Sequence, residues 1–99
     1  MADPTLSTSV TVPVMWDKET NQIVNNESSQ LIRIFNSSFN KLTGNTDDYY
    51  PKDLRLEIDS WNNCIYENVN NGVYRAGFAK SQPAYDAAID RLFETLDTL

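Results

Sequence analysis

The front of the chain carries two short apolar runs separated by a polar turn. Residues 10–16 read Val-Thr-Val-Pro-Val-Met-Trp, residues 17–21 are polar, and residues 22–24 are extended in character again. β-branched and aromatic residues of this kind favour strands, so the pattern predicts a β-hairpin. Pro13 cannot donate a hydrogen bond to a neighbouring strand. The first strand should therefore be an edge strand or lose its pairing there, and the peptide bond before Pro13 can be cis.

The following segment has the apolar spacing of an amphipathic α-helix. Residues 25–29 (Asn-Asn-Glu-Ser-Ser) offer side chains that cap helices, and Gly44 with Asn45 is a helix stop. Between these signals the apolar residues recur at helical spacing, at Leu31, Ile32, Ile34, Phe35, Phe39 and Leu42. The spacing predicts one helix over residues 31–42.

Two more helices are predicted in the second half of the chain. The first has apolar residues every three or four positions, at Leu54, Ile58, Trp61, Ile65 and Val69. Residues 70–72 (Asn-Asn-Gly) should end or bend it, and residues 73–78 read as a short connector. Ser81 is the expected N-cap of the last helix, with Pro83 in its first turn. The expected inward-facing residues of that helix are Tyr85, Ala88, Ile89, Leu92, Phe93 and Leu96.

The order of these elements, one hairpin and then three helices, predicts an α+β fold that is mostly helical. A two-stranded sheet is marginally stable by itself, so the hairpin should pack on a helix or on strands from outside this sequence. The last helix is still in phase at Leu99. Residues 1–9, which are small and polar around Pro4, are expected to be a disordered leader. We interpret the chain as part of a larger domain.

The charge of the chain argues against two classes of partner. Fourteen acidic and eight basic residues give a net charge of −6, and the sequence pI is about 4.3. Such a chain repels phosphate backbones and anionic membranes, so neither nucleic acid nor a membrane is expected as a partner. No segment approaches the roughly 18 apolar residues of a membrane span, and no signal peptide is visible. A reduced, cytoplasmic location is the expectation.

The chain has one cysteine, Cys64, and no histidine. An intramolecular disulfide is impossible. Neither a zinc site nor a serine-type catalytic triad is expected, and no metal ligand is assigned. Cys64 lies next to the apolar positions Trp61 and Ile65 of a predicted helix, which favours a buried, inert thiol over a nucleophile.

Most other conspicuous side chains receive a structural interpretation. The aromatic residues expected in the core are Phe35, Trp61, Tyr66 and Phe93. The acidic residues expected to form a solvated helix face are Asp86, Asp90, Glu94 and Asp97. Neither group is assigned a role in chemistry.

Two separated sequence motifs carry a family resemblance. The first is VPVMWD at residues 12–17, followed by IVNNESS at residues 23–29 and LTGN at residues 42–45. The second is NNGVYRAGFA at residues 70–79. Together they resemble the glutathionyl-hydroquinone reductases, which are the Xi class of glutathione transferases. Two motifs in the same order are more specific than one short pattern.

The resemblance implies a domain division. Residues 10–44 would be a partial thioredoxin-like segment, in which the hairpin and the helix after it complete the glutathione-binding domain. Residues 45–99 would begin the helical C-terminal domain of a glutathione transferase with its first two helices. The resemblance implies glutathione as co-substrate, with no metal, and glutathionyl-hydroquinones as the other small-molecule partners.

The resemblance also implies roles for four residues. Val12 would make main-chain contacts to the cysteinyl part of glutathione, because an extended peptide can pair with exposed strand backbone. Glu27 would pair with the γ-glutamyl ammonium, and Ser28 would bind the adjacent carboxylate. Tyr74 would be the proton donor or acceptor at the quinone site. The alternatives are a plain helix N-cap for residues 26–29 and an aromatic residue that packs the domain junction for Tyr74.

The sequence departs from the family pattern in two ways that bear on activity. It lacks the Cys-Pro-Trp-Ala motif that carries the catalytic cysteine of the family, and Ser9 stands where the pattern tends to have an arginine that contacts glutathione. We therefore expect part of a reductase that removes glutathione from glutathionyl-hydroquinones, inactive by itself. The alternative is a non-catalytic helical module that binds glutathione weakly or self-associates, for example as a homodimer.

Overall fold

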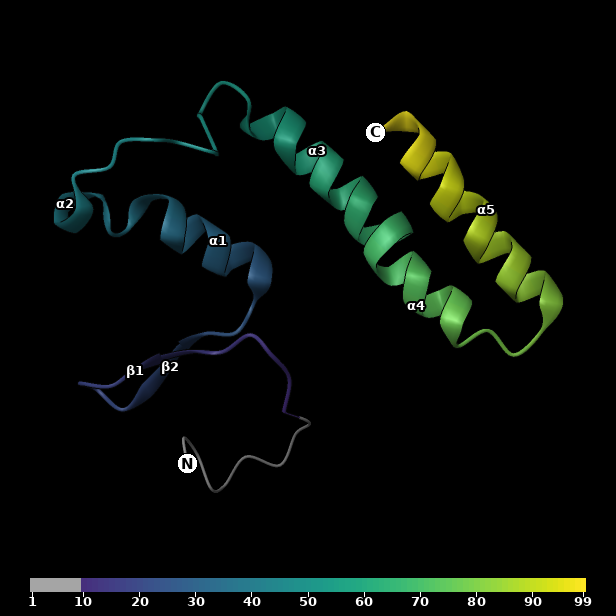
Figure 1. The fold of residues 1–99 in the computed structure, drawn as a ribbon, viewed down its shortest axis with the longest axis horizontal. Helices are drawn as coiled ribbons and strands as arrows, with labels where there is room; N and C mark the ends of the chain where they lie inside the picture. Colours follow the sequence, from purple (N-terminus) through teal and green to yellow (C-terminus); the bar gives the residue numbers. More distant parts are fainter. Residues whose placement is uncertain (1–9) are drawn as a thin grey trace. The chain divides into compact units, whose positions relative to one another are not determined.

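The computed structural model describes residues 10–99, and the expected leader at residues 1–9, with Ser9, lies outside the described residues. The chain divides into two compact units, with the boundary between Tyr50 and Pro51. Figure 1 labels the elements of both units. The first unit holds a hairpin and two helices, and the regular elements of the second are all helical. The α+β, mostly helical fold expected from the sequence is confirmed.

The first unit opens with the predicted β-hairpin. Strand β1 (Met15–Asp17) runs antiparallel to strand β2 (Gln22–Asn25). In the turn between them, the carboxylate of Asp17 accepts hydrogen bonds from the backbone N–H groups of Glu19 at 2.8 Å and Thr20 at 3.3 Å. These donors favour the ionised carboxylate and hold the pKa of Asp17 below its ordinary value of 3.8.

The first strand is shorter than the sequence predicts. Residues 10–14 lie outside the ladder, which starts at Met15 and has an irregular register between Met15 and Trp16. Pro13 has no backbone N–H to donate, which explains why pairing stops before it is reached. The peptide bond between Val12 and Pro13 is cis. Val12 itself is 90% exposed, so this stretch of backbone is open.

The single helix predicted over residues 31–42 is divided in two. Helix α1 spans Ser28–Ser37 and the short helix α2 spans Asn40–Thr43. Serine hydroxyls compete with the backbone for hydrogen-bond partners, which weakens a helix at a serine pair. Here the pair Ser37 and Ser38 ends α1, and the prediction of one unbroken helix was wrong.

The loop after α2 is attached to α1. The side chain of Asn36 donates to the carboxylate of Asp48 at 2.8 Å and accepts from the backbone N–H of Tyr49 at 2.8 Å. The guanidinium carbon of Arg33 lies 3.7 Å from the ring centre of Tyr50, a cation–π contact. These contacts explain why the first unit extends to Tyr50. The domain boundary expected after residue 44 stays a prediction.

The second unit is a hairpin of helices. Helix α3 (Arg55–Ile65), the π-helical turn η1 (Tyr66–Asn70) and helix α4 (Asn71–Gly77) follow one another without a break. Helix α5 (Gln82–Thr98) runs back beside η1 and α4 (Figure 1). In η1 the N–H of Asn71 donates to the carbonyl five residues earlier, which is the wide turn of a π-helix.

The connector predicted at residues 73–78 is wrong, because residues 71–77 are helical. Gly72 and Ala76 are buried, and a Cβ added to Gly72 would lie 4.0 Å from the Cβ of Leu92 on α5. This distance is an ordinary van der Waals contact, so Gly72 lies against α5 with room for a methyl group. This packing outweighs the low helix propensity of the asparagines and glycine at residues 70–72.

Few apolar side chains are buried among the described residues. They are Leu31 in the first unit and Ala76 and Leu92 in the second. Thr95 is buried with them, and its hydroxyl donates to the backbone carbonyl of Arg91 at 2.9 Å. The core of the second unit is therefore a thin seam between α4 and α5.

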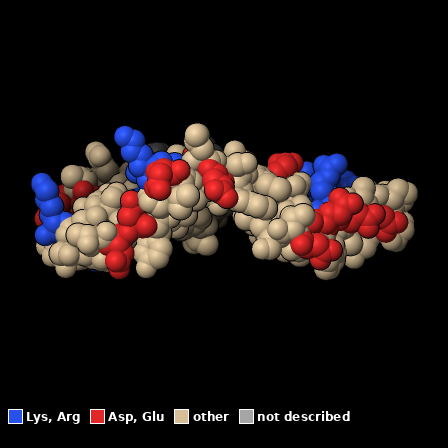
Figure 2. All heavy atoms as spheres, turned by 90° about the horizontal axis from the view of Figure 1, so that it is seen from above, with Lys and Arg blue, Asp and Glu red and all other residues tan. Residues whose placement is uncertain are grey.

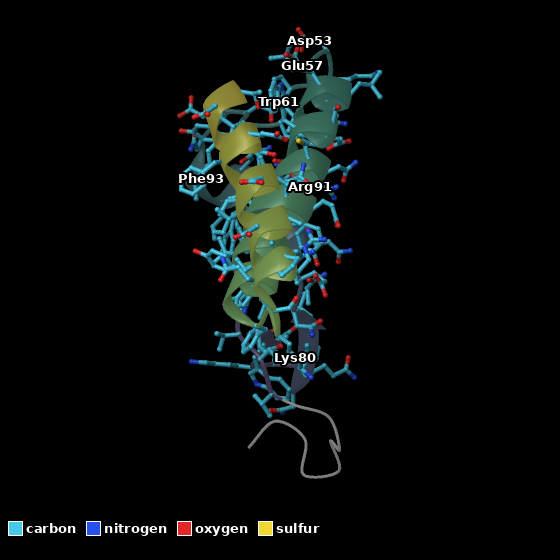
Figure 3. All side chains as sticks on the ribbon, turned by 90° about the vertical axis from the view of Figure 1, so that its right-hand side faces the viewer. Asp53, Glu57, Trp61, Lys80, Arg91 and Phe93 are labelled. Carbon is cyan, nitrogen blue, oxygen red and sulfur yellow. The ribbon has the colours of Figure 1, made fainter. Side chains whose placement is uncertain are left out.

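The aromatic core expected from the sequence is not observed. Phe35, Trp61, Tyr66 and Phe93 are all exposed, and so are Tyr85 and Leu96, which were expected to face inward. In Figure 3 the side chain of Phe93 points away from α3. Within its unit α5 has helical neighbours on one side only, and such a neighbour covers one stripe of a helix. The apolar residues on the other stripes stay in contact with solvent.

Two predictions about α5 are confirmed. The hydroxyl of Ser81 accepts a hydrogen bond from the N–H of Ala84 at 3.3 Å, which caps the helix. The acidic residues of the predicted solvated face, Asp86, Asp90, Glu94 and Asp97, are exposed.

On the face drawn in Figure 2, acidic side chains gather in groups and basic side chains are scattered. Among residues 10–99, no helix has both the length and the apolar character that a membrane crossing requires.

Substitutions at two glycines are expected to change stability in opposite directions. Gly44 ends α2 with a φ of +71°, where a Cβ costs about 1–2 kcal/mol, so Gly44→Ala should destabilise the first unit. Gly72 lies inside α4, where its added Cβ would make only an ordinary contact. Gly72→Ala should stabilise the second unit by about 0.5–1 kcal/mol. Urea unfolding followed through amide signals of each unit measures both effects, and a change of the same sign at both sites would contradict the backbone argument.

Candidate functional site

The residues expected to bind the γ-glutamyl end of glutathione lie at the start of α1. Glu27 is the N-cap residue, with φ −102° and ψ 116°, and Ser28 is the first residue of the helix. Both are exposed. The carbonyl of Glu27 accepts from the N–H groups of Gln30 at 3.0 Å and Leu31 at 2.9 Å, but its side chain makes no capping hydrogen bond. The helix uses the backbone of Glu27 and not its carboxylate.

The entry into α1 is fixed by Asn25. Its side-chain oxygen accepts from the N–H of Glu27 at 2.7 Å, and its side-chain nitrogen donates to the side chain of Gln30 at 2.6 Å. The side chains of residues 25–29 were predicted to cap the helix, and none of them accepts a hydrogen bond from its first turn. The first N–H groups of a helix have no acceptor within it, so the turn that begins at Ser28 presents donors and the positive end of the helix dipole.

Val12 lies at the same end of the hairpin as the start of α1. Met15 pairs with Asn25 in antiparallel register, so the residues before Met15 and the residues after Asn25 continue from one pair. The N–H and carbonyl of Val12 make no hydrogen bond to the described residues. The first unit therefore places an unpaired stretch of backbone and a helix N-terminus at one end of its hairpin.

Tyr74 lies on α4 in the second unit, in the segment predicted to be a connector. Its side chain is 66% exposed. The ring stacks on that of Phe78, with the centroids 6.5 Å apart and the planes inclined by 8°. Among the described residues, none is hydrogen-bonded to the Tyr74 hydroxyl. The stacking holds one face of the ring, and most of the side chain stays accessible to solvent.

Cys64 is half-buried, and the side-chain nitrogen of Asn68 lies 3.5 Å from its sulfur. The expected full burial of this thiol is wrong, because within its unit α3 is covered on one side only. For residues 10–99, no group of three or more His, Cys, Asp or Glu side chains is placed to hold a metal ion.

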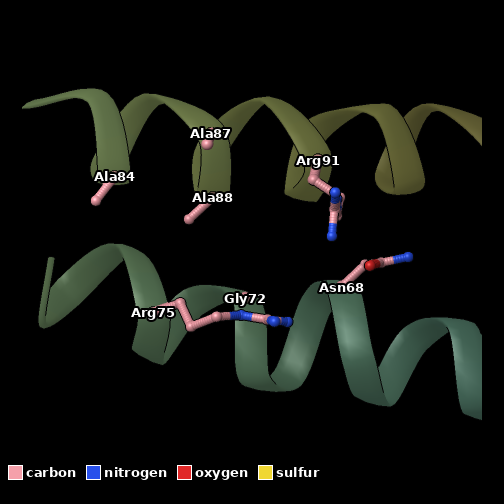
Figure 4. A pocket seen from close by; sticks show the side chains of 7 residues that line it. All are labelled: Asn68, Gly72, Arg75, Ala84, Ala87, Ala88 and Arg91. Carbon is pink, nitrogen blue, oxygen red and sulfur yellow. The ribbon is translucent and has the colours of Figure 1, made fainter.

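The second unit also contains a pocket that the sequence analysis missed. It has a volume of about 290 Å³ and lies between α5 and the η1–α4 segment (Figure 4). Its lining residues are Asn68, Gly72, Arg75, Ala84, Ala87, Ala88 and Arg91. Because residues 73–78 were predicted to be a connector, the sequence pattern did not place Arg75 on a helix. The available signal was the helical spacing of small residues, Gly72 with Ala76 and Ala84 with Ala88.

Curated proteins related to the chain match nearly its whole length. The chain is 54% identical over 98 residues to glutathionyl-hydroquinone reductase YqjG of Escherichia coli K12, which covers 99% of this chain and 30% of the relative. It is 45% identical over 102 residues to glutathione S-transferase omega-like 2 of Schizosaccharomyces pombe, covering 99% of this chain and 33% of the relative. No protein-family model matches the chain. The chain spans about 30% of the length of the first of these relatives.

Solved structures agree with these relatives. The glutathione-bound structure of YqjG from Escherichia coli matches with a TM-score of 0.91 at 54% identity, over 98% of this chain and 32% of that one. The Xi glutathione transferase from Phanerochaete chrysosporium matches with a TM-score of 0.90 at 52% identity, over 97% of this chain and 33% of that one. The expected fold, the end of a thioredoxin-like domain followed by the first helices of a glutathione transferase helical domain, is consistent with both.

Proposed function

Because the chain is homologous, over nearly its whole length, to one segment of the glutathionyl-hydroquinone reductases and Xi-class glutathione transferases, we propose that it supplies the glutathione-contacting segment of such an enzyme. For the complete enzyme we propose the removal of glutathione from glutathionyl-hydroquinones, in line with the relatives named glutathionyl-hydroquinone reductases. The observation that carries the proposal is the start of α1, where an exposed carboxylate that the helix does not use stands beside helix N–H donors.

The start of α1 matches the γ-glutamyl end of glutathione, which carries an ammonium and a carboxylate side by side. The carboxylate of Glu27 is an acceptor for the ammonium, and a charge-assisted bond of this kind is stronger than a neutral one. The N–H and hydroxyl of Ser28, in the first turn of a ten-residue helix, are donors for the carboxylate. Two adjacent residues thus complement two adjacent charges.

Val12 and Tyr74 extend the proposed site. The unpaired backbone of Val12 supports strand-like pairing with the cysteinyl residue of glutathione. The exposed phenol of Tyr74, stacked on Phe78, would exchange a hydrogen bond and a proton with the phenolic oxygen of the hydroquinone. A cytoplasmic location and a homodimer stay predictions.

Titration of the 99-residue chain with reduced glutathione tests the binding proposal. We expect saturable shifts of the amide signals of Val12, Glu27 and Ser28 in ¹H–¹⁵N spectra at millimolar ligand. Cysteinylglycine, which lacks the γ-glutamyl residue, is the matched control ligand and should leave Glu27 and Ser28 unmoved. A well-dispersed spectrum that does not respond to glutathione would sink the proposal.

We further propose that the chain has no turnover by itself. Its only thiol, Cys64, lies on α3 of the second unit, whereas the proposed glutathione contacts all lie in the first. The purified chain should release no glutathione from a glutathionyl-hydroquinone. Turnover that survives Cys64→Ser would show that the assignment of an inactive segment is wrong.

A non-catalytic self-association module is the second candidate function. Exposed apolar side chains in the second unit favour it, since Leu56 is 89% exposed and Phe93 is 55% exposed. Sedimentation equilibrium distinguishes the two candidates when combined with the glutathione titration. A dimer without any glutathione response would favour the module.

A further inference from the structure

We infer that the pocket between α5 and the η1–α4 segment binds a small oxyanion, either a carboxylate or a phosphate group. The pocket shares no residue with the glutathione contacts proposed above, and all its lining residues lie in the second unit. The inference rests on two features of the lining, its cations and its small side chains (Figure 4).

Two guanidinium groups reach the pocket from opposite helices. Arg75, from α4, is held by Glu67, with its Nη1 2.9 Å from Oε1 and its Nη2 bonded to the backbone carbonyl of the same residue. Arg91, from α5, has no ion pair within residues 10–99. In Figure 4 its side chain extends from α5 towards Asn68. Since Glu67 balances the charge of Arg75, Arg91 supplies the net positive charge of the site.

The chemistry of these groups selects an oxyanion. A guanidinium presents parallel N–H donors that match the two oxygens of a carboxylate or phosphate, and the pairing is stronger than a neutral hydrogen bond. Asn68 adds a side-chain amide, of which one N–H is directed to Cys64 and the other is left for the anion. The chain has a net charge of −6, so its overall electrostatic potential repels anions. The positive charge of Arg91 makes the potential in the pocket locally more favourable to an anion.

The remaining lining residues provide space and no competing charge. Gly72 from α4 and Ala84, Ala87 and Ala88 from α5 end at or before Cβ. The pocket volume is about 290 Å³. One water molecule in the liquid occupies roughly 30 Å³, so the pocket has room for several water molecules. The pocket therefore admits the anion with water, or an anionic group attached to a small organic molecule.

Titration of the ¹⁵N-labelled chain with sodium phosphate and, separately, sodium acetate tests the inference, with sodium chloride holding the ionic strength constant. We expect saturable amide shifts at Gly72, Ala84 and Ala88, with a dissociation constant of about 1 mM, the range for a few charge-assisted bonds. A response to phosphate alone identifies a phosphate site, and a response to both anions identifies a general oxyanion site. Shifts that grow linearly and equal those caused by chloride would overturn the inference.

Matched variants locate the binding. Arg91→Gln should weaken binding at least about fivefold. Lys80→Gln removes the same charge from the turn between α4 and α5, at a distance from Arg91 along the unit (Figure 3), and should leave the affinity unchanged. If Arg91→Gln disturbs the fold, Arg91→Lys keeps the charge without the planar fork and should weaken binding about threefold. Full affinity in a folded Arg91 variant would refute the assignment.

Discussion

Truncating Leu92 to alanine is expected to destabilise the second unit by about 2–4 kcal/mol, the usual cost of removing a buried leucine side chain. Leu92 is 7% exposed and lies on the seam between α4 and α5. Few other apolar side chains of that unit are buried, so the loss cannot be shared with a larger core. Urea unfolding followed through amide signals of α5 measures the change in the free energy of unfolding.

Phe93→Ala is the matched control for this prediction. Phe93 is the next residue along α5 and the larger side chain, but it is 55% exposed. Its truncation should cost less than about 1 kcal/mol, since much of its area is already in water. Signals of the hairpin in the first unit should survive in both variants. An equal loss of stability in the two variants would show that burial between α4 and α5 does not determine the stability of the second unit.

Replacing Glu27 with glutamine should weaken glutathione binding about tenfold, which corresponds to the loss of one charge-assisted bond. The carboxylate is exposed and is not used by α1, so the substitution removes a ligand contact and should leave the helix intact. Calorimetric titration with reduced glutathione measures the dissociation constant, and circular dichroism confirms that the helix content is kept.

The control for Glu27 is Glu19→Gln in the hairpin turn. It removes the same charge from the same unit, and the backbone N–H that Glu19 donates to Asp17 is retained. The affinity for glutathione should therefore not change beyond about twofold, the effect of a remote exposed charge. Equal weakening by both substitutions would mean that Glu27 acts through net charge alone. Cysteinylglycine should bind both variants as it binds the parent chain.

Local signals in the sequence predicted the ends of several elements well. Ser81 followed by Pro83 is enough to locate the start of α5, because the cap and the tolerated proline act within one turn. Gly44 marks the end of α2 because its positive φ is a local requirement. The hairpin turn at residues 17–21 likewise needs only its own side chains.

Features that depend on contacts between residues far apart in the sequence could not be predicted from the local pattern. The helical state of residues 71–77 depends on packing against α5, and propensity alone disfavours it at Asn71 and Gly72. The exposure of Trp61 and Phe93 depends on how many neighbours a helix has, which the spacing of apolar residues does not state. Arg75 and Arg91 are 16 positions apart in the sequence (91 − 75) and meet in one pocket only because α4 and α5 run side by side.

Within the candidate site, the sequence predicted the position of the helix start but not its hydrogen bonds, and the roles assigned to its residues stay predictions. Glu27 and Ser28 were assigned from a motif, and the helix start on which they stand was predicted with them. The sequence did not indicate that Asn25 would fix the entry into α1 and leave the Glu27 carboxylate unused. Such a division of roles among adjacent polar residues is decided by backbone dihedrals, which the composition of the segment does not specify.

The π-helical turn η1 sets the angular phase between α3 and α4. Each residue of a regular α-helix advances about 100° around the axis, whereas the wider turn of a π-helix absorbs one extra residue. A heptad count carried forward from α3 therefore assigns the wrong face to Gly72 and Arg75. Deleting one residue from residues 66–70 would rotate α4 about its own axis relative to α3. The extra residue in η1 thus offsets the faces of α3 and α4, and the face of α4 that carries Gly72 and Ala76 is the one that packs on α5.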